Sequence, residues 1–221
     1  MILEKDFFCQ FTSYSNPDIA KRMCGTTSVA MVLSAHNKLY RFVTSSRNLD
    51  NLFKYLLDFH KNDVPVVKRP FVFEDDTIYV TVGLPNEVTM LEGDILSNDT
   101  EFAPYFSLVR GYDHRFSKNL FSNFNIKAEA VEQIDSNYIF DKLSSRKTKY
   151  FLASLQSKSI DALSSFRSSH IVVVHNAYIS SNEKYVEYVD CSESDYILAK
   201  KSLPINEFEK IFLGRGTEIK N

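Results

Sequence analysis

The segment CGTTSVAMVLSAHNK, which begins at Cys24, is apolar on nearly every side over residues 29–33. A helix that is apolar around its whole circumference is buried in a core, whereas an amphipathic helix lies on a surface. The hydroxyl-bearing residues 26–28 are suited to cap free N–H groups at the start of such a helix. The pattern therefore predicts a buried helix that starts at Cys24.

Helical spacing of apolar residues recurs further along the chain. In residues 48–61, the apolar side chains follow the i, i+3, i+4, i+7, i+8 pattern of one helical face. These side chains are Leu49, Leu52, Phe53, Leu56 and Leu57. We expect shorter helices at residues 111–123 and 136–145, and another after Pro204 within residues 202–212.

Strand-forming residues dominate residues 64–83 and the last third of the chain. Residues 64–83 are rich in β-branched and aromatic side chains, and the acidic residues 74–76 are suited to turn a hairpin. Strands are also predicted in four later segments, at residues 127–134, 149–155, 170–179 and 184–190. The loop at residues 180–183 fits a second hairpin. The Gly-Arg-Gly sequence at residues 214–216 is predicted to turn the chain into a final strand at 217–220.

The order of these elements indicates the fold class. Helices come mostly first, and strands joined by hairpins come after them, which is typical of an α+β fold with an antiparallel sheet. The length of 221 residues suits one domain, and no linker rich in Pro, Gly and Ser divides the chain. We therefore predict a single α+β domain over residues 1–221.

Charge and hydropathy exclude several classes of protein. The chain has 26 basic and 28 acidic side chains and a formal net charge of −2, whereas nucleic-acid binding needs clustered Lys and Arg. No apolar run approaches the roughly 20 residues of a transmembrane helix, so neither a nucleic acid nor a membrane is predicted as a partner. The opening MILEKDFFCQF has early acidic residues and no long apolar run, so we expect no signal peptide and a cytoplasmic location.

Cysteine and histidine spacing argues against a disulfide framework and against a metal site. The chain has three Cys, an odd number, and five His, without a CxxC or HxxxH pair. Zinc sites and disulfide-stapled domains use closely spaced ligands or an even number of Cys. We therefore predict no metal and no cofactor.

Cys24 is the first candidate for chemistry. The positive end of a helix dipole favours the thiolate, which is the nucleophilic form of cysteine. Gly25 allows the backbone of a substrate to approach closely beside the sulfur. The alternative is a buried structural cysteine at a helix start.

His170 and Asp190 form the second candidate. His170 heads the apolar strand HIVVV, and the hairpin that follows brings Asp190, at the end of KYVEYVD, back beside it. A carboxylate in that position is suited to accept the Nδ1 proton and fix the imidazole tautomer. The order Cys, His, Asp then supplies a nucleophile, a base and an orienting group, unless the two strand-end residues are unrelated.

Gln10 is a candidate for the oxyanion hole, which needs hydrogen-bond donors. The backbone N–H of Cys24 at a helix start is one donor, and the side-chain amide of Gln10, which lies 14 residues upstream of Cys24, is suited to be another. Taken alone, Gln10 also reads as an ordinary surface glutamine.

These residues resemble the papain-like cysteine peptidases of family thirty-nine, which include bacteriocin-processing, double-glycine leader peptidases. That family opens with Gln, a short variable stretch and C-G-P-[TA]-S-x-x-M-[VI]-L, which is similar to Q…CGTTSVAMVL here. Its second signature, H-x-V-V-V-x-G and a hairpin into x-V-x-D-P, resembles HIVVVHN and EYVDC. The segments GYDHRFSKNLFSNFNI and EFEKIFLGRG look like the family's middle helix and its closing helix and strand.

The resemblance implies a papain-like fold in which a buried nucleophile helix packs on a C-terminal antiparallel sheet. By position, Cys24 matches the nucleophile, His170 the general base, Asp190 the residue that orients the histidine, and Gln10 the oxyanion-hole amide. Residues 64–104 have no counterpart and look like an insertion into the single domain.

Three positions depart from the family pattern. Thr26 replaces the usual Pro, Asn176 stands where the strand normally ends in Gly, and Cys191 replaces the Pro after the aspartate. None of these changes removes a catalytic atom, but they indicate a divergent member. The substrate therefore does not follow from the resemblance.

The expected function is that of a cysteine-dependent hydrolase that cleaves an amide bond through a thioacyl intermediate, with a peptide or acyl compound as its substrate. An acyltransferase that uses the same triad on a thioester or amide donor is the first alternative. A non-catalytic binding module on the same fold is the second, because fold does not imply function. The sequence does not specify the oligomeric state.

Overall fold

The structure is a computed structural model that describes most of the chain. The described residues are 1–15, 17–20, 23–43, 47–53, 55–56, 67–73, 76–82, 114, 117–156 and 169–221. Apart from the strands β1 and β2, the expected insertion at residues 64–104 lies outside this part of the chain.

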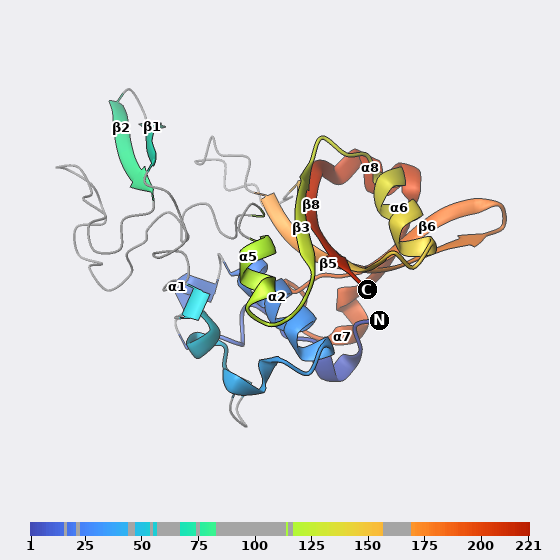
Figure 1. The fold of residues 1–221 in the computed structure, drawn as a ribbon, viewed down its shortest axis with the longest axis horizontal. Coiled ribbons are helices and arrows are strands. Elements are labelled where there is room, and N and C mark those ends of the chain that lie inside the picture. The colour runs from blue at the N-terminus through green and yellow to red at the C-terminus, as the bar shows by residue number, and fades with distance from the viewer. Residues whose placement is uncertain are drawn as a thin grey trace.

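The main element is a six-stranded antiparallel sheet in the order β3-β8-β4-β5-β6-β7 (Figure 1). Its strands are β3 (Ala128–Glu132), β4 (Thr148–Gln156), β5 (Ser169–Ser180), β6 (Glu183–Val189), β7 (Lys200–Pro204) and β8 (Phe212–Lys220). With the helices that cover it, this sheet confirms the predicted α+β class.

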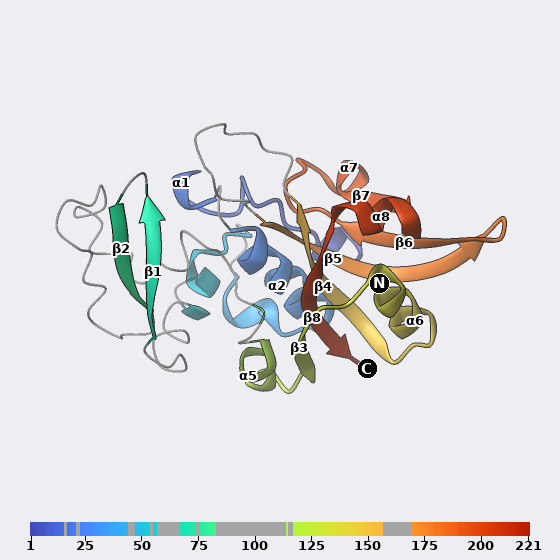
Figure 2. The same cartoon turned by 90° about the horizontal axis from the view of Figure 1, so that it is seen from above.

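The helices cover both faces of the sheet. They are α1 (Pro17–Ala20), α2 (Cys24–Ala35), α5 (Ser117–Ser122), α6 (Ser136–Ser144), α7 (Tyr196–Ala199) and α8 (Ile205–Ile211), with short 3₁₀ helices at Glu4–Asp6 and Leu39–Arg41. Figures 1 and 2 show α2 on one side of the sheet and α6 and α8 on the other. Each face therefore has its own hydrophobic core, and α2 lies in the larger one.

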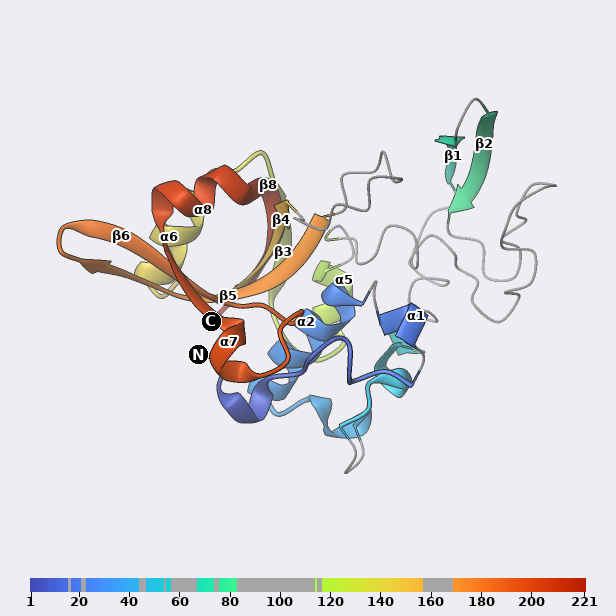
Figure 3. The ribbon, with the colours of Figure 1, turned by 180° about the vertical axis from the view of Figure 1, so that it is seen from behind.

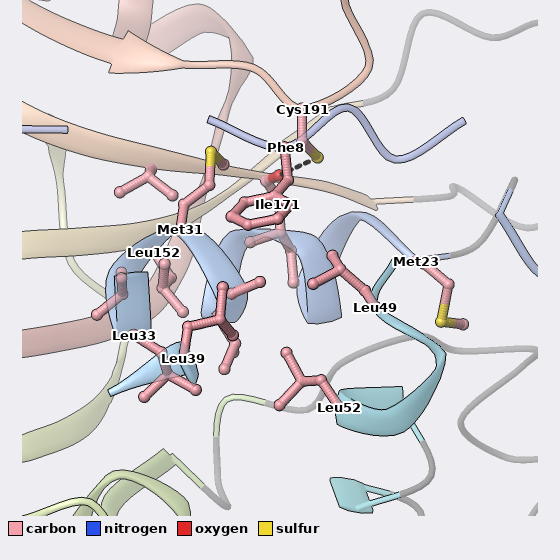
Figure 4. Close-up of a cluster of buried hydrophobic side chains, with 14 of the residues drawn as sticks. Phe8, Met23, Met31, Leu33, Leu39, Leu49, Leu52, Leu152, Ile171 and Cys191 are labelled. Carbon is pink, nitrogen blue, oxygen red and sulfur yellow. Dashed lines mark hydrogen bonds between the residues drawn. The ribbon is translucent and has the colours of Figure 1, made fainter. Parts of the chain in front are cut away.

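The buried helix predicted at Cys24 is confirmed. All residues of α2 from Gly25 to Leu33 are buried, and their side chains pack against residues of β5 such as Ile171 and Val173 (Figure 4). This packing stabilises a helix with no polar face, because its apolar surface is removed from water on every side.

The other helix predictions are confirmed with different limits. In the segment 48–61, residues 50–53 and 55–56 are helical, and residues 57–61 lie outside the described part. The helix expected at residues 111–123 is described as α5, and α6 starts one residue after Asp135, which accepts a 2.8 Å hydrogen bond from the N–H of Tyr138 as an N-cap. Among the described residues, no helix is long and apolar enough to cross a bilayer.

Both predicted hairpins are present. Strands β1 (Val67–Phe73) and β2 (Asp76–Val82) pair antiparallel in a separate sheet. Strands β5 and β6 are joined by Ser181 and Asn182, whose positive φ angles of 49° and 63° fit a tight two-residue turn. Strand β7 and helix α7 were not expected, because neither is long enough to show a periodic pattern.

The turn predicted at residues 214–216 is wrong. Residues 214–216 lie inside strand β8, which runs from Phe212 to Lys220, and Gly216 pairs with Ala153 on one side and Val131 on the other. The pairing with β4 shifts register between Phe212 and Gly216, where Gly214 has a positive φ of 67°, so the chain has an irregularity within the strand and no turn before it. A Cβ atom at Gly216 would lie 2.3 Å from the Leu152 carbonyl oxygen and 2.2 Å from the Phe151 ring. The glycine therefore serves a close approach of two strands rather than a turn.

Replacing Gly216 with alanine is expected to lower the free energy of unfolding by about 2 to 3 kcal/mol, because the added methyl group overlaps a backbone oxygen that cannot rotate away. Chemical denaturation of the variant measures this loss. The matched control is Arg215→Ala, an exposed position on the same strand, which is expected to change stability by less than about 0.5 kcal/mol. Equal stability of both variants would contradict the close approach.

Candidate active site

The start of α2 is anchored to the sheet and to the N-terminal segment. The hydroxyl of Thr27 donates a 2.7 Å hydrogen bond to the carbonyl of Met23 and lies 3.0 Å from the hydroxyl of Tyr14. The hydroxyl of Ser28 donates to the carbonyl of Ile171 on β5 at 3.1 Å. For Thr27 and Ser28, the prediction that the hydroxyls cap free N–H groups is therefore wrong, since both donate to carbonyl groups. The Ser28 bond fixes the helix start against β5.

Cys24 is the first residue of α2, and its partly buried side chain lies beside His170, the second residue of β5. The thiol and the imidazole lie close enough together that each shifts the pKa of the other. The Nε2 atom of His170 lies 2.6 Å from Asp190 Oδ1, which leaves Nδ1 as the ring nitrogen that faces the sulfur. The structure thus brings together the three residues that were predicted to act in one site.

Asp190 lies one residue beyond the end of β6, where Val189 pairs with Val173. Its carboxylate reaches across the sheet end to the Nε2 of His170 rather than to the Nδ1 that the sequence argument expected. That detail of the prediction is wrong, because the ring presents Nε2 to the carboxylate. The contact between His170 and Asp190 that orients the ring is present, but Nε2 makes it in place of Nδ1.

The carboxylate of Asp190 is held from several directions. Its Oδ1 accepts hydrogen bonds from the N–H of Ser192 at 2.9 Å and from the hydroxyl of Ser192 at 2.6 Å. Its Oδ2 lies 3.3 Å from the ammonium group of Lys201 on β7, which also contacts Glu193 at 2.5 Å. These contacts fix the carboxylate and therefore the plane of the His170 ring.

The electrostatics favour a charged pair of Cys24 and His170. Burial raises the pKa of the Cys24 thiol, but the hydrogen bond and charge of His170 and the N–H groups of Ile171 and Gly25 outweigh it, so the pKa lies below its ordinary value of 9.0. Burial lowers the pKa of His170, but Asp190 and Cys24 raise it to about 10. Asp190 also loses solvent, yet His170 and Ser192 hold the pKa of its carboxyl well below the usual range. The thiolate of Cys24 and the imidazolium of His170 thus stabilise each other.

Gln10 is buried, with 4% of its surface exposed, so the reading as a surface glutamine is wrong. Its N–H donates a 2.8 Å hydrogen bond to the carbonyl of Cys191. The thiol of Cys191 lies 3.3 Å from Gln10 Oε1 and 3.6 Å from the carbonyl oxygen of Cys24. Gln10 and Cys24 therefore both contact the sulfur of Cys191, and Figure 3 shows the chain after β6 running beside the N-terminal segment.

Two other described histidines, His36 and His175, have structural surroundings. Nδ1 of His175 accepts a 2.9 Å hydrogen bond from the N–H of Ile2 in the core. Burial lowers the pKa of His175 to about 4, and it lowers the pKa of His36 to about 4 at the end of α2. Both rings are therefore neutral at physiological pH. Within the described ranges, no cluster of three or more His, Cys, Asp or Glu side chains is arranged to hold a metal ion.

Two residues beside Asp190 were missed by the sequence argument. Ser192 follows Asp190 by two positions, and this Asp-x-Ser spacing is a local signal for a side chain that bonds the backbone two residues on. Lys201 gave no comparable signal, because it meets Asp190 only through the unexpected strand β7.

Comparisons with known proteins add no family assignment. No protein-family model matches the chain, and a search of curated proteins found no match.

Proposed function

We propose that the protein is a cysteine-dependent hydrolase of the papain-like type, which cleaves an amide bond through Cys24, His170 and Asp190. One observation carries the proposal: a thiol at the first residue of a buried helix lies beside an imidazole whose Nε2 atom is 2.6 Å from a fixed carboxylate. This is the arrangement in which a thiolate is activated as a nucleophile. The resemblance of both sequence signatures to family thirty-nine points to the same chemistry.

In the first half of the reaction, the Cys24 thiolate attacks the carbonyl carbon and the carbonyl electrons move to the oxygen. The backbone N–H of Cys24 and the amide of Gln10 donate hydrogen bonds to this oxyanion. As the oxyanion collapses, the bond to the leaving nitrogen breaks, and the imidazolium of His170 gives that nitrogen its proton. A thioester on Cys24 remains.

In the second half, neutral His170 removes a proton from water as the water oxygen attacks the thioester. The second oxyanion collapses, the carbon–sulfur bond breaks, and the thiolate–imidazolium pair is restored as the acid leaves. Asp190 stays ionised throughout and keeps the ring in place. An acyltransferase would differ only in the nucleophile of this half-reaction, so hydrolysis and transfer share every residue named above.

The proposal is tested by following the protein with p-nitrophenyl acetate, because this ester acylates activated thiols without any knowledge of the natural substrate. We expect a burst of p-nitrophenolate, one acetyl group per chain by intact mass, and loss of that group as the thioester hydrolyses. Cys9 and Cys191 are 7% and 0% exposed, so the adduct should map to Cys24. Acylation no faster than that of free cysteine would contradict the proposal and favour a binding module.

The pH dependence of Cys24 reactivity follows from the charged pair. Since the pKa of Cys24 lies below 9.0, its alkylation by iodoacetamide should reach its plateau at a lower pH than the alkylation of a free thiol does. Since the pKa of His170 is raised to about 10, turnover should fall as the pH rises through that value and the general acid is lost. Alkylation and turnover rates measured from pH 4 to 11, with free cysteine as reference, give the rise of the first and the fall of the second. A pH dependence of Cys24 alkylation that matches that of free cysteine would rule out the thiolate–imidazolium pair.

A further inference from the structure

The oxyanion role of Gln10 depends on which end of its amide faces the sulfur of Cys24. Only the NH₂ end donates hydrogen bonds, whereas the oxygen end would repel an oxyanion. The two ends have nearly the same shape, so packing alone does not choose between them. A neighbouring group that binds one end selectively therefore decides whether the donor is available.

Cys191 is placed to make this choice. Its Sγ lies 3.3 Å from Gln10 Oε1, and its carbonyl accepts the Gln10 N–H at 2.8 Å, so one residue holds both the backbone and the side chain of Gln10. Within the part of the chain that the structure describes, no second group donates to Gln10 Oε1. In the flipped orientation, the NH₂ group of Gln10 would face the sulfur, which is only a weak acceptor, and the S–H group would lose its acceptor at Gln10.

The surroundings of Cys191 keep its thiol protonated and place it beside hydrogen-bond acceptors. The side chain is fully buried, and burial together with the nearby negative charges of Cys24 and Asp190 raises the pKa of its thiol well above the ordinary value. The carbonyl oxygens of Cys24 and Ile171 lie 3.6 and 3.9 Å from the sulfur, and the second contact is drawn in Figure 4. Gln10 Oε1 is the nearest of the three acceptors.

We propose that Cys191 is a positioning residue, whose S–H donates to Gln10 Oε1 and thereby turns the Gln10 NH₂ group towards the oxyanion at Cys24. The inference rests on the proposed function. It also gives a role to one of the three positions at which the chain departs from the pattern of family thirty-nine, since the proline of that pattern has no donor to offer. Cys191 touches neither the substrate nor the reacting atoms and acts only through Gln10.

The test compares Cys191→Ala, which removes the donor, with Cys191→Ser, which keeps one. Acylation of Cys24 by p-nitrophenyl acetate passes through an oxyanion, whereas alkylation by iodoacetamide does not. We expect Cys191→Ala to slow acylation about 3- to 10-fold, or about 0.6 to 1.4 kcal/mol, and to leave alkylation unchanged. Cys191→Ser should acylate within about twofold of the wild-type rate, since a hydroxyl donates a hydrogen bond at least as well as a thiol does.

A double-mutant cycle with Gln10→Ala separates positioning from packing. If Cys191 acts through Gln10, adding Cys191→Ala to Gln10→Ala should cause no further loss of acylation rate. The inference would be overturned if Cys191→Ala slowed acylation as much in the Gln10→Ala protein as in the wild type. It would also be overturned if Cys191→Ser and Cys191→Ala slowed acylation equally. Thermal unfolding checks each variant, and Cys191→Val, which fills the site but has no donor, replaces Cys191→Ala if the latter does not fold.

The same measurements keep this inference separate from the proposed function. Wild-type protein that is not acylated at Cys24 would refute the function and, with it, the inference. Rapid acylation at Cys24 with no response to Cys191→Ala or Cys191→Val would refute the inference alone.

Discussion

Replacing Cys24 with alanine is expected to abolish acylation by p-nitrophenyl acetate and all turnover of an amide substrate. Alanine has no atom that can form the thioester, and the remaining groups can only hold a carbonyl in place. The fold should persist, because Cys24 is partly exposed at the first residue of α2 while the packing residues of that helix lie further along it. Intact-mass measurements and burst kinetics on the folded variant give the result.

The matched control for this variant is Cys9→Ala, which also removes one thiol but from a buried position outside the triad. It should keep the acylation rate of the wild type. Wild-type rates in Cys24→Ala would show that the reactive group lies elsewhere, and the whole enzymatic proposal would be lost. Thermal unfolding of both variants distinguishes a chemical loss from a folding defect.

The sequence predicted the elements that carry the site, because each has a strong local pattern. The segment after Cys24 is apolar on nearly every side and is stable only inside a core, so both its burial and its first residue could be predicted. His170 and Asp190 flank a hairpin whose strands are rich in Val and Tyr, so the meeting of the two ends followed from antiparallel pairing. The choice of ring nitrogen did not follow, because it depends on how the ring turns at a strand end.

Contacts between distant segments were not predictable in the same way. Gln10 and Cys191 are 181 positions apart, and no local pattern marks their contact, so a buried Gln10 looked like a surface residue. The glycines at 214 and 216 carry a turn signal, yet the neighbouring ring of Phe151 needs Gly216 inside a strand. The burial of Gln10 and the place of Gly216 inside a strand both depend on contacts with a segment that is distant in the sequence.

Replacing Gln10 with alanine is expected to have the second large effect on the acylation rate. Its amide is not needed to ionise Cys24, because His170 and the N–H groups of Ile171 and Gly25 lower the pKa of that thiol. The amide acts on the oxyanion, which exists only in the transition state and the intermediate. Removing one oxyanion-hole donor costs roughly 10²–10³ in rate, or about 3 to 4 kcal/mol, so Gln10→Ala should slow acylation by that factor.

Iodoacetamide alkylation of the Gln10→Ala variant is the internal control, because that displacement forms no oxyanion and its rate should barely change. His170→Ala should behave differently and slow both reactions, since it removes the partner of the thiolate and the general acid together. The pair of rates on both variants separates stabilisation of the oxyanion from ionisation of the sulfur. If Gln10→Ala acylates at the wild-type rate, Gln10 is only a buried structural residue, and another donor must complete the oxyanion hole beside the N–H of Cys24.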